Sequence, residues 1–344
     1  MSGLLENTKA ATKQKLSKSL KHKNIAISPL DWGLGHTARI VPVVKYLQKK
    51  QYNIYIFCNK TQQKFLQNEL ENVNYIYLKG YNVDYSKSDS QLVKIFFQIP
   101  KILRKISYEH NLLKKYDKKL DFDKVVSDNR YGFFLKNKTS AIISHQIYIK
   151  TPLRFLVLEQ LLNKINTFLL NRFSVCLIPD FENEYKSLAG ELSHKNIHLK
   201  RKKYIGILSR FPSKCNNEIE KKYVLAILSG PETQRNIFEK IIIDKFKNTD
   251  KRLIIAGSLG KNKVETDNIT IKQLVNSKEL FSLICNSEYV ITRSGYSSIM
   301  DLYVLQKKAV LVATPGQTEQ EYLAEFHKKN QLFKCYTQQE FSLR

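Results

Sequence analysis

Short apolar runs alternate along the chain with longer stretches whose apolar residues recur every three or four positions. The first run, Asn24–Pro29, precedes a glycine turn and then Thr37–Lys50, which has the spacing of an amphipathic helix. The alternation predicts further strands at Asn53–Cys58, Asn74–Leu78, Lys124–Ser127, Ser140–Ser144 and Val175–Pro179, with helices that include Ser90–Tyr116 and Leu153–Phe173. Strands that alternate with helices are typical of a parallel sheet covered by helices on both faces.

The same alternation starts again after residue 217. Its predicted strands are Tyr223–Leu228, Arg252–Ala256, Tyr289–Thr292, Ala309–Val312 and Leu332–Cys335, and its predicted helices are Pro231–Phe246, Ser277–Asn286, Ser297–Leu305 and Thr318–Lys329. A chain of 344 residues is long enough for two hydrophobic cores. We therefore expect an α/β protein with two doubly wound, Rossmann-like domains that face a cleft. They would span residues 24–208 and 218–344, with a polar linker at 209–217 and a basic extension at 1–23.

The composition is that of a folded protein from a reducing compartment. Hydrophobic residues make up 42% of the chain, which is far above the content of disordered chains. The five cysteines are odd in number, scattered, and form no CxxC pair or cluster with histidine. We therefore expect neither disulfides nor structural zinc, and a cytoplasmic location. Neither a signal peptide nor a membrane span is predicted, because no apolar run reaches 18 residues.

The chain is strongly basic, with 57 Lys and Arg residues against 31 Asp and Glu residues and a net charge of +26. Such an excess suggests nucleic acid or an anionic membrane as a partner. The lysines are spread evenly through a chain that is also rich in Asn and Ile, so the charge alone says little about function. Nucleic-acid binding stays a distant alternative, and no nucleic acid is expected as a partner, because no recognised nucleic-acid module is present.

Seven of the twelve glycines follow predicted strands closely. In an open parallel sheet, ligands bind beyond the carboxyl ends of the strands, where glycine lets backbone amides approach a phosphate and the next helix presents its N-terminus. Each glycine taken alone has the alternative explanation of an ordinary turn. Seven glycines that follow strands favour a ligand-binding edge in each domain, with the two edges facing each other across a cleft. They are Gly33, Gly35, Gly230, Gly257, Gly260, Gly295 and Gly316.

The segment Asp31–Arg39, DWGLGHTAR, places His36 at the start of the first predicted helix. A helix N-terminus disfavours the imidazolium form, so His36 would stay neutral and could accept a proton as a general base. A capping or packing histidine is the alternative. The third glycine position of a dinucleotide fingerprint is Ala38, and no acidic residue ends the second strand, so we exclude an NAD site.

Four further acidic or histidine positions are candidates for the site. Asp128 and His145 follow predicted strands at the edge where His36 is expected, so both are catalytic candidates, with helix or turn capping as the alternative. The pair in Asp121-Phe122-Asp123 is of a kind that can hold a divalent metal ion against a diphosphate. It precedes its strand and so belongs to the opposite edge. We therefore expect no metal site and no cofactor.

A second polar segment follows the predicted strand Tyr289–Thr292. It contains the turn Arg293-Ser294-Gly295, then Asp301, and then the turn Pro315-Gly316-Gln317 before Gln320-Glu321. It resembles the donor-binding half of family 28 glycosyltransferases of the glycosyltransferase-B fold, which have an Arg-Ser-Gly turn, an acidic residue six positions after that glycine, and a Pro-x-Gln turn before paired Gln or Glu residues. The family acid is Glu where this chain has Asp301. The loops Gly33-Leu34-Gly35-His36 and Ser229-Gly230 resemble two other loops of the family. The matching residues of the second segment are Arg293, Ser294, Gly295, Asp301, Pro315, Gly316, Gln317, Gln320 and Glu321.

The resemblance implies an inverting, metal-independent transfer of a sugar from a nucleotide-sugar, with uridine as the expected base. The first domain would bind the acceptor, with His36 as the base, and the second would bind the nucleotide. Amides near Gly230 and Gly295 and the charge of Arg293 would stabilise the departing diphosphate. The expected donor-binding residues are Gly33, Gly35, Ser229, Gly230, Arg293, Ser294, Gly295, Asp301, Gln317, Glu319, Gln320 and Glu321.

Two aspects of the function stay open at this point. A nucleotide-sugar hydrolase of the same fold, in which water replaces the acceptor, is the nearest alternative to a transferase. The acceptor is expected to be a carbohydrate or a glycolipid. Apolar residues at helical spacing with interspersed basic residues in Leu92–Ile106 and Leu153–Phe173 predict peripheral attachment of the first domain to an anionic membrane at its inner face. A buried core face is the alternative for both stretches.

Overall fold

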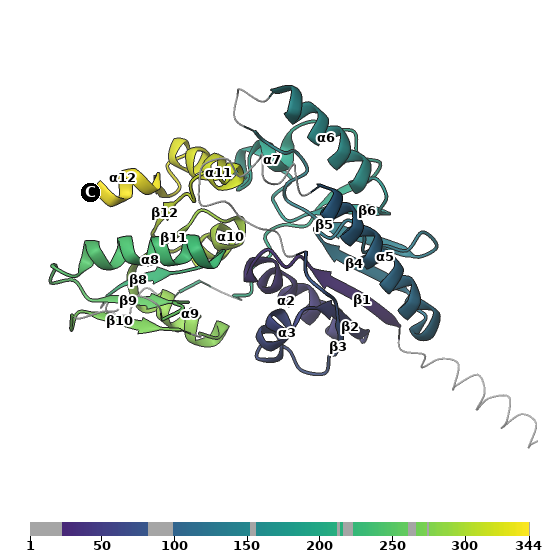
Figure 1. The fold of residues 1–344 in the computed structure, drawn as a ribbon, viewed down its shortest axis with the longest axis horizontal. Coiled ribbons are helices and arrows are strands. Elements are labelled where there is room, and N and C mark those ends of the chain that lie inside the picture. The colour runs from purple at the N-terminus through teal and green to yellow at the C-terminus, as the bar shows by residue number, and fades with distance from the viewer. Residues whose placement is uncertain are drawn as a thin grey trace, which may run out of the picture.

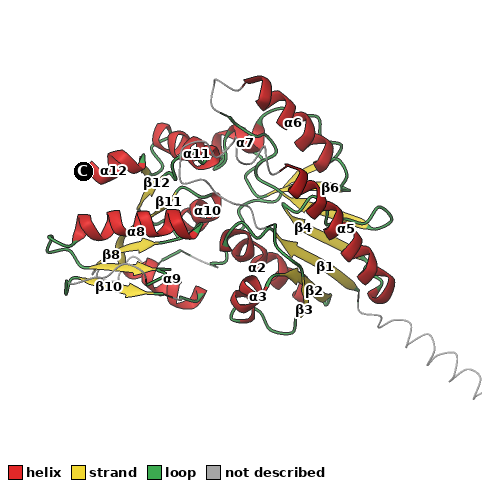
Figure 2. Ribbon diagram, viewed as in Figure 1, coloured by secondary structure: helices red, strands yellow, loops and turns green. Residues whose placement is uncertain are grey.

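The computed structural model describes residues 23–81, 99–151, 156–211, 214–215, 223–260, 266–273 and 275–343. These residues form two α/β units, each built on one parallel sheet with helices packed against it (Figure 1). Figure 2 shows the two sheets separately, with helices between and around them. The predicted architecture of two doubly wound domains is therefore confirmed.

The first sheet has seven parallel strands in the order β3-β2-β1-β4-β5-β6-β7. Its strands are β1 (Asn24–Pro29), β2 (Asn53–Cys58), β3 (Asn74–Tyr77), β4 (Lys124–Asp128), β5 (Thr139–Ile143), β6 (Val175–Ile178) and β7 (Lys202–Tyr204). Its helices are α2 (Leu34–Lys49), α3 (Lys60–Gln67), α5 (Ile99–Leu120), α6 (Leu156–Leu170), η2 (Glu184–Lys186) and α7 (Glu191–His194). Central strands such as β1 are buried along their length, because helices cover both faces of the sheet.

The second sheet has six parallel strands in the order β10-β9-β8-β11-β12-β13. Its strands are β8 (Tyr223–Ile227), β9 (Leu253–Ala256), β10 (Ile269–Lys272), β11 (Ser287–Arg293), β12 (Ala309–Val312) and β13 (Lys334–Tyr336). Its helices are α8 (Glu232–Phe246), α9 (Ser277–Asn286), α10 (Tyr296–Val304), α11 (Thr318–Lys329) and α12 (Gln338–Leu343). Helix α12 packs on α8, with the rings of Phe341 and Phe238 6.0 Å apart.

Each sheet has a point where the strand order reverses, and the expected site loops lie at these two points. In the first sheet, β1 lies between β2 and β4, with Pro29 in register with Asp128. In the second, β8 lies between β9 and β11. Ligands of open α/β sheets bind beyond the carboxyl ends of strands at such switch points. The loop that carries His36 follows β1, and the loop of Gly230 follows β8.

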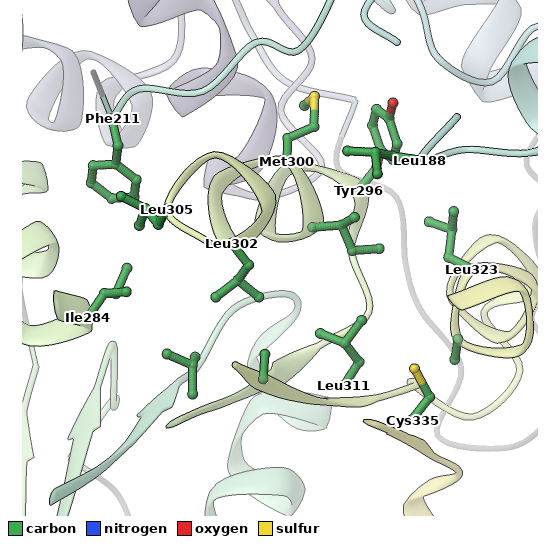
Figure 3. Packing of buried hydrophobic residues seen from close by; sticks show 14 of the residues in the cluster. Leu188, Phe211, Ile284, Tyr296, Met300, Leu302, Leu305, Leu311, Leu323 and Cys335 are labelled. Carbon is green, nitrogen blue, oxygen red and sulfur yellow. The ribbon is translucent and has the colours of Figure 1, made fainter. Parts of the chain in front are cut away.

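A shared hydrophobic core joins the second domain to the segment that follows the first sheet's β6. Tyr296, Met300 and Leu302 of α10 pack in the cluster that also holds Leu188 and Phe211 (Figure 3). All five are at most 4% exposed. The two domains are therefore not connected by the linker alone, since residues from 188 to 211 contribute to the core of the second domain.

The sequence pattern missed several short elements and one covalent bond. Strands β7 and β10 and helices α7 and α12 were not predicted, because they have three to six residues and too few apolar positions to show a period. The expectation of no disulfide was wrong, since Cys215 and Cys285 are bonded across 70 residues, with Cα atoms 5.1 Å apart. Spacing along the chain could not reveal this pair, because only the fold brings the linker beside α9.

Some expectations fall outside the described residues. These include the basic extension up to residue 22 and residues 92–98 of the stretch Leu92–Ile106. In the part of the chain that the structure describes, no helix is long and apolar enough to cross a membrane. The Asp121 and Asp123 pair lies at the amino edge of the first sheet, as predicted. Asp121 pairs with Lys138 at 2.8 Å, and an Asp123 oxygen accepts from the amide of Asn24 at 2.8 Å.

Candidate active site

The first site element is the turn between β1 and α2. Gly33 caps the helix with φ of +106°, a left-handed conformation that side chains with a Cβ rarely adopt. The first turn of α2 then presents His36, whose side chain is 18% exposed. A Cβ built on Gly35 would lie 3.2 Å from the hydroxyl oxygen of Ser297 in α10, so this turn lies directly against the second domain.

Asp128, the last residue of β4, lies beside this turn and contacts His36. Its carboxylate is fully buried, and its Oδ2 atom is 3.2 Å from the Nδ1 atom of His36. Burial alone would raise the pKa of Asp128, but the positive charge of Arg39 and the contact with His36 outweigh it and hold the pKa below its usual value. Asp128 is therefore a charged, fixed partner for the histidine. Two of the predicted catalytic residues, one from α2 and one from β4, meet here.

Arg39 competes with Asp128 for the same nitrogen of His36. Its Nη2 atom lies 2.8 Å from Nδ1 of His36 and also contacts Oδ1 of Asp128. A guanidinium only donates, so the contact with Arg39 requires an unprotonated Nδ1, whereas the contact with Asp128 requires a protonated one. The two contacts correspond to alternative tautomers of His36. The tautomer of His36 therefore depends on which of the two contacts Nδ1 makes.

His145, the third predicted catalytic residue, follows β5 and belongs to the same cluster. Its Nδ1 atom is 3.0 Å from Nη1 of Arg39, so this nitrogen is the acceptor and the proton is on Nε2. Nε2 faces Oε1 of Glu319 at 3.0 Å, across the domain boundary. The ring also stacks on Tyr296 of α10, with centroids 4.1 Å apart and planes 8° apart. Burial lowers the pKa of His145 and so favours its neutral form, whereas the charge of Glu319 acts in the opposite direction.

The loops of the second domain surround the N-termini of α8, α10 and α11. Gly230 precedes α8 with φ of +91°, and its carbonyl accepts from Arg235 at 2.8 Å. Gly295 is the N-cap of α10; no side chain caps this helix, and no atom lies within 4 Å of a Cβ built there. The backbone at Gly295 is therefore open to a ligand. A helix N-terminus with free amides is a favourable position for an anion such as a phosphate.

The turn before α11 is held by its own side chains. The Gln320 Oε1 atom accepts from the amide of Thr314 at 3.0 Å, and Glu321 Oε1 accepts from the amide of Gly316 at 2.8 Å. The hydroxyl of Ser294 donates to the carbonyl of Gln320 at 2.8 Å, which connects this turn to the one before α10. Gln317 is the N-cap residue of α11. The two predicted donor loops are thus brought together and fixed to each other.

Comparison with known proteins gives one family match, within the second half of the chain. Residues 224–344 match the family model for the glycosyltransferase family 28 C-terminal domain. This match begins within β8 and includes every candidate residue of the second domain. No curated protein sequence matches the chain.

Solved glycosyltransferase structures match almost the whole chain at low sequence identity. The glycotransferase of kitacinnamycin is 13% identical over 92% of this chain and 86% of its own, with a TM-score of 0.64. The spinosyn rhamnosyltransferase SpnG, complexed with thymidine diphosphate, is 10% identical over 91% of this chain and 86% of its own, with a TM-score of 0.59. MurG of Acinetobacter baumannii is 14% identical over 93% of this chain and 87% of its own, with a TM-score of 0.53.

The chain has the glycosyltransferase-B fold and is similar to the family 28 glycosyltransferases. The family model supports glycosyl transfer as the class of function, and the structural neighbours show the fold. Gly295 lies in the part of the chain that the family model matches, and His36 lies outside it.

Arg293 has a different environment from the one expected for a diphosphate contact in this fold. Its side chain is 2% exposed, and its guanidinium donates to the carbonyl of Ala313 at 3.0 Å and to Oε1 of Gln338 at 2.7 Å. It also lies 4.0 Å from the ring centre of Phe238. Burial lowers its pKa to about 9. In this conformation Arg293 connects β11, β12 and α12 and does not present its charge at the loops of Gly230 and Gly295.

Asp301 is likewise engaged within the protein. Its Oδ1 atom accepts from the hydroxyl of Ser209 at 2.6 Å, and its Oδ2 atom lies 3.3 Å from Nε of Arg210. Burial raises the pKa of Asp301, while the charge of Arg210 opposes the rise. The carboxylate thus attaches the linker to α10. Of the remaining expected donor residues, Ser229 is exposed at the Gly230 turn.

Two residues of the site were missed by the sequence reasoning. Arg39 lies three positions after His36, which places both on one face of α2, and this spacing was the available signal. Tyr296 directly follows Gly295, yet nothing in the sequence distinguishes a ring that stacks on a histidine of another domain from one that packs in a core. Its hydroxyl donates to the carbonyl of Pro179 at 2.7 Å.

Proposed function

We propose that the protein is a glycosyltransferase that transfers a sugar from a nucleotide-diphosphate-sugar to a hydroxyl group of an acceptor, with inversion at the anomeric carbon. The observation that carries this proposal is the contact of His36 with a buried, charged Asp128 at a sheet switch point, directly against the helix α10 of a family 28 type of domain. A base on one side and a phosphate-binding helix end on the other are the two groups that this reaction needs.

In the proposed reaction, His36 is the general base. With Nδ1–H directed at Asp128, its Nε2 atom takes the proton from the acceptor hydroxyl as that oxygen bonds to the anomeric carbon. The bond from the anomeric carbon to the phosphate oxygen breaks in the same step, and the nucleoside diphosphate leaves. A single displacement inverts the configuration. Arg39 must release Nδ1 of His36 for this tautomer, so Arg39 is a positioning residue.

The nucleotide would bind to the second domain. Backbone amides at Gly295 and the turn at Gly230 offer donors to the diphosphate, and a helix N-terminus favours negative charge there. Such donors act on the departing diphosphate without a metal ion, and we propose that the reaction is metal-independent. SpnG binds thymidine diphosphate, and the family resemblance makes uridine diphosphate the first nucleotide to test.

The alternative within this fold is a nucleotide-sugar hydrolase. Water in place of the acceptor would use the same His36 and Asp128 pair, so the geometry is compatible with both reactions. Release of free sugar from a nucleotide-sugar without an acceptor separates them. Stoichiometric release at a rate that acceptors do not change would favour the hydrolase.

A thermal-shift screen of nucleotides and nucleotide-sugars tests the proposal first. A ligand present at 100 times its dissociation constant stabilises the folded protein by about 2.7 kcal/mol. We expect stabilisation by a nucleoside diphosphate and by one of its sugar conjugates. A Gly295→Val variant, with a side chain at the open backbone, should lose this shift, whereas Tyr77→Val, at a 57% exposed position of β3 in the first domain, should keep it. Absence of any nucleotide effect would contradict the proposal.

A further inference from the structure

The only tryptophan of the chain, Trp32, lies in the turn before His36 and is exposed to solvent. Trp32 is 41% exposed, and Leu34, two positions further along the turn, is also 41% exposed. In the part of the chain that the structure describes, the indole takes part in no hydrogen bond and no ring contact. Tryptophan is on average one of the well-buried residues of a folded domain. Packing in the core of the first domain therefore does not explain this side chain.

A buried network of charges holds the residue that precedes this tryptophan. Arg130 donates to one carboxylate oxygen of Asp31 at 3.1 Å, and the amide of Tyr81 donates to the other at 3.0 Å. Arg130 is fully buried and also pairs with Glu109. The proposed reaction uses none of these charges. Because a buried polar network with paired members is rigid, it fixes Asp31 relative to the loops that follow β3 and β4.

The other end of the same turn is also fixed. His36 contacts Asp128, which lies two positions before Arg130, so both ends of the turn are attached to the carboxyl end of β4. Between them, Gly33 has φ of +106°, and a Cβ built there has no atom within 4 Å. The turn is therefore a rigid support, and it holds the indole beside open space.

Trp32 is close enough to His36 for one ligand to contact both side chains. The two residues are four positions apart in the sequence, so their Cα atoms are at most about 14 Å from each other. Each side chain extends several ångströms from its Cα atom, and the space between them suits a group of the size of one sugar ring. The indole therefore lies within reach of an acceptor whose hydroxyl group meets Nε2 of His36.

We propose that Trp32 binds the acceptor, with a pyranose ring stacked on the indole while one of its hydroxyl groups faces Nε2 of His36. This inference rests on the proposed transfer reaction and gives the acceptor a chemical class. A pyranose has a face of C–H groups and a rim of hydroxyl groups. The indole complements both, because it has an apolar ring face and an N–H donor that no described residue engages. An aliphatic chain would cover the ring and offer no acceptor to that N–H group.

Tryptophan fluorescence tests this proposal directly, because the emission comes from a single residue. The probes are the methyl glycosides of glucose, galactose, mannose and N-acetylglucosamine, each titrated into the full chain with and without uridine diphosphate. We expect at least one glycoside to change the emission in a saturable way and to protect Trp32 from quenching by acrylamide. Octanol is the aliphatic comparison and should do neither.

Calorimetric titration of the responding glycoside into variants tests the side chain itself. Trp32→Ala should lose roughly tenfold or more in affinity, whereas Trp32→Phe keeps a ring and should stay within about threefold of the parent. Tyr46→Ala, in the last turn of α2 and 60% exposed, is the matched control and should bind as the parent does. With that glycoside as the acceptor, Trp32→Ala should raise its KM by a similar factor and change kcat less. The urea midpoints should stay at the parent value, since both positions are exposed.

Three results would overturn the proposal. They are no emission change with any of the glycosides, a response to octanol alone, or equal glycoside affinity of Trp32→Ala and the parent. Nucleotide-induced thermal shifts are measured on the same proteins. A normal nucleotide shift without a glycoside response overturns the role of Trp32 alone, whereas a glycoside response without any nucleotide shift contradicts the proposed function and leaves the sugar contact of Trp32 in place.

Discussion

The Nε2 atom of His145 lies 3.0 Å from the Oε1 atom of Glu319, and this contact joins the two domains at the candidate site. The histidine follows β5 of the first sheet, and the glutamate is in the first turn of α11 of the second. The stack of His145 on Tyr296 lies beside it. The structure is thus a closed arrangement in which groups from both halves already touch.

Removal of this cross-domain contact should weaken the protein. Glu319→Ala leaves the Nε2–H group of the buried His145 without its acceptor, and an unpaired buried donor costs about 1 to 3 kcal/mol. We expect that loss in the free energy of unfolding by urea. Glu325→Ala, on the exposed side of the same helix, is the control and should change it by less than about 0.5 kcal/mol. Equal stability of the two variants would mean that the contact contributes nothing to domain closure.

Arg39 and Asp128 should behave as a coupled pair. Arg39→Met leaves a buried carboxylate without its counter-charge, which costs about 3 to 5 kcal/mol, whereas the double variant with Asp128→Asn removes both charges. We expect the double variant to be more stable than Arg39→Met alone, as measured by urea unfolding. Additive effects in this double-mutant cycle would show that the two side chains do not depend on each other.

The Asp301→Ala variant distinguishes a structural role of this carboxylate from the ribose contact that the family resemblance implies. Because its carboxylate binds Ser209 and Arg210, we expect Asp301→Ala to lower the free energy of unfolding by about 1 to 3 kcal/mol. Its nucleotide dissociation constant, from calorimetric titration, should stay within about threefold of the parent value. An affinity loss of tenfold or more at an unchanged urea midpoint would instead support the ribose contact that the family resemblance implies.

His327 should make stability depend on pH. Burial lowers the pKa of this residue from 6.5 to about 4, and its Nε2 atom donates to the carbonyl of Leu188 at 2.9 Å. In the unfolded chain His327 is protonated below about pH 6.5, whereas in the folded protein it is protonated only below about pH 4. The free energy of unfolding therefore decreases as the pH falls from about 6.5 to about 4. We expect a loss of about 2 kcal/mol between pH 7.5 and pH 5.

The His327→Gln variant supplies the control for this titration. It cannot take up the proton, so the part of the pH dependence that comes from His327 should disappear between pH 7.5 and pH 5. The same loss in parent and variant would assign the pH dependence to other groups.

Much of the fold followed from periodicity, because long buried strands and amphipathic helices carry strong patterns. Helix α9 was predicted at its observed bounds, Ser277–Asn286. The edge strands β7 and β10 were not, since an edge strand needs few apolar residues. Helix α6 buries the polar residues Glu159 and Asn166 and exposes the apolar residue Phe168. This orientation could not be predicted, because periodicity identifies an apolar face without showing whether that face packs inward.

The part of the candidate site at the carboxyl edge of the first sheet could be predicted, because its residues follow or end predicted strands. His36, Asp128 and His145 were expected at one edge and lie together in the structure. The environments of Arg293 and Asp301 were not predictable, because burial and pairing with Gln338 or Arg210 depend on segments that are distant in the sequence. The disulfide between Cys215 and Cys285 could not be predicted for the same reason, since the two cysteines are 70 residues apart in the sequence.

The measurement that tests the central claim most directly is sugar transfer by His36→Ala, compared with the parent and with His198→Ala, on a loop before β7. A general base contributes about 10² to 10⁴ in rate. We expect His36→Ala to lose transfer by that factor while its nucleotide dissociation constant stays unchanged, because the base acts on the acceptor and not on the nucleotide. Transfer by His36→Ala within a few-fold of the parent would contradict the account and leave His36 as a structural residue.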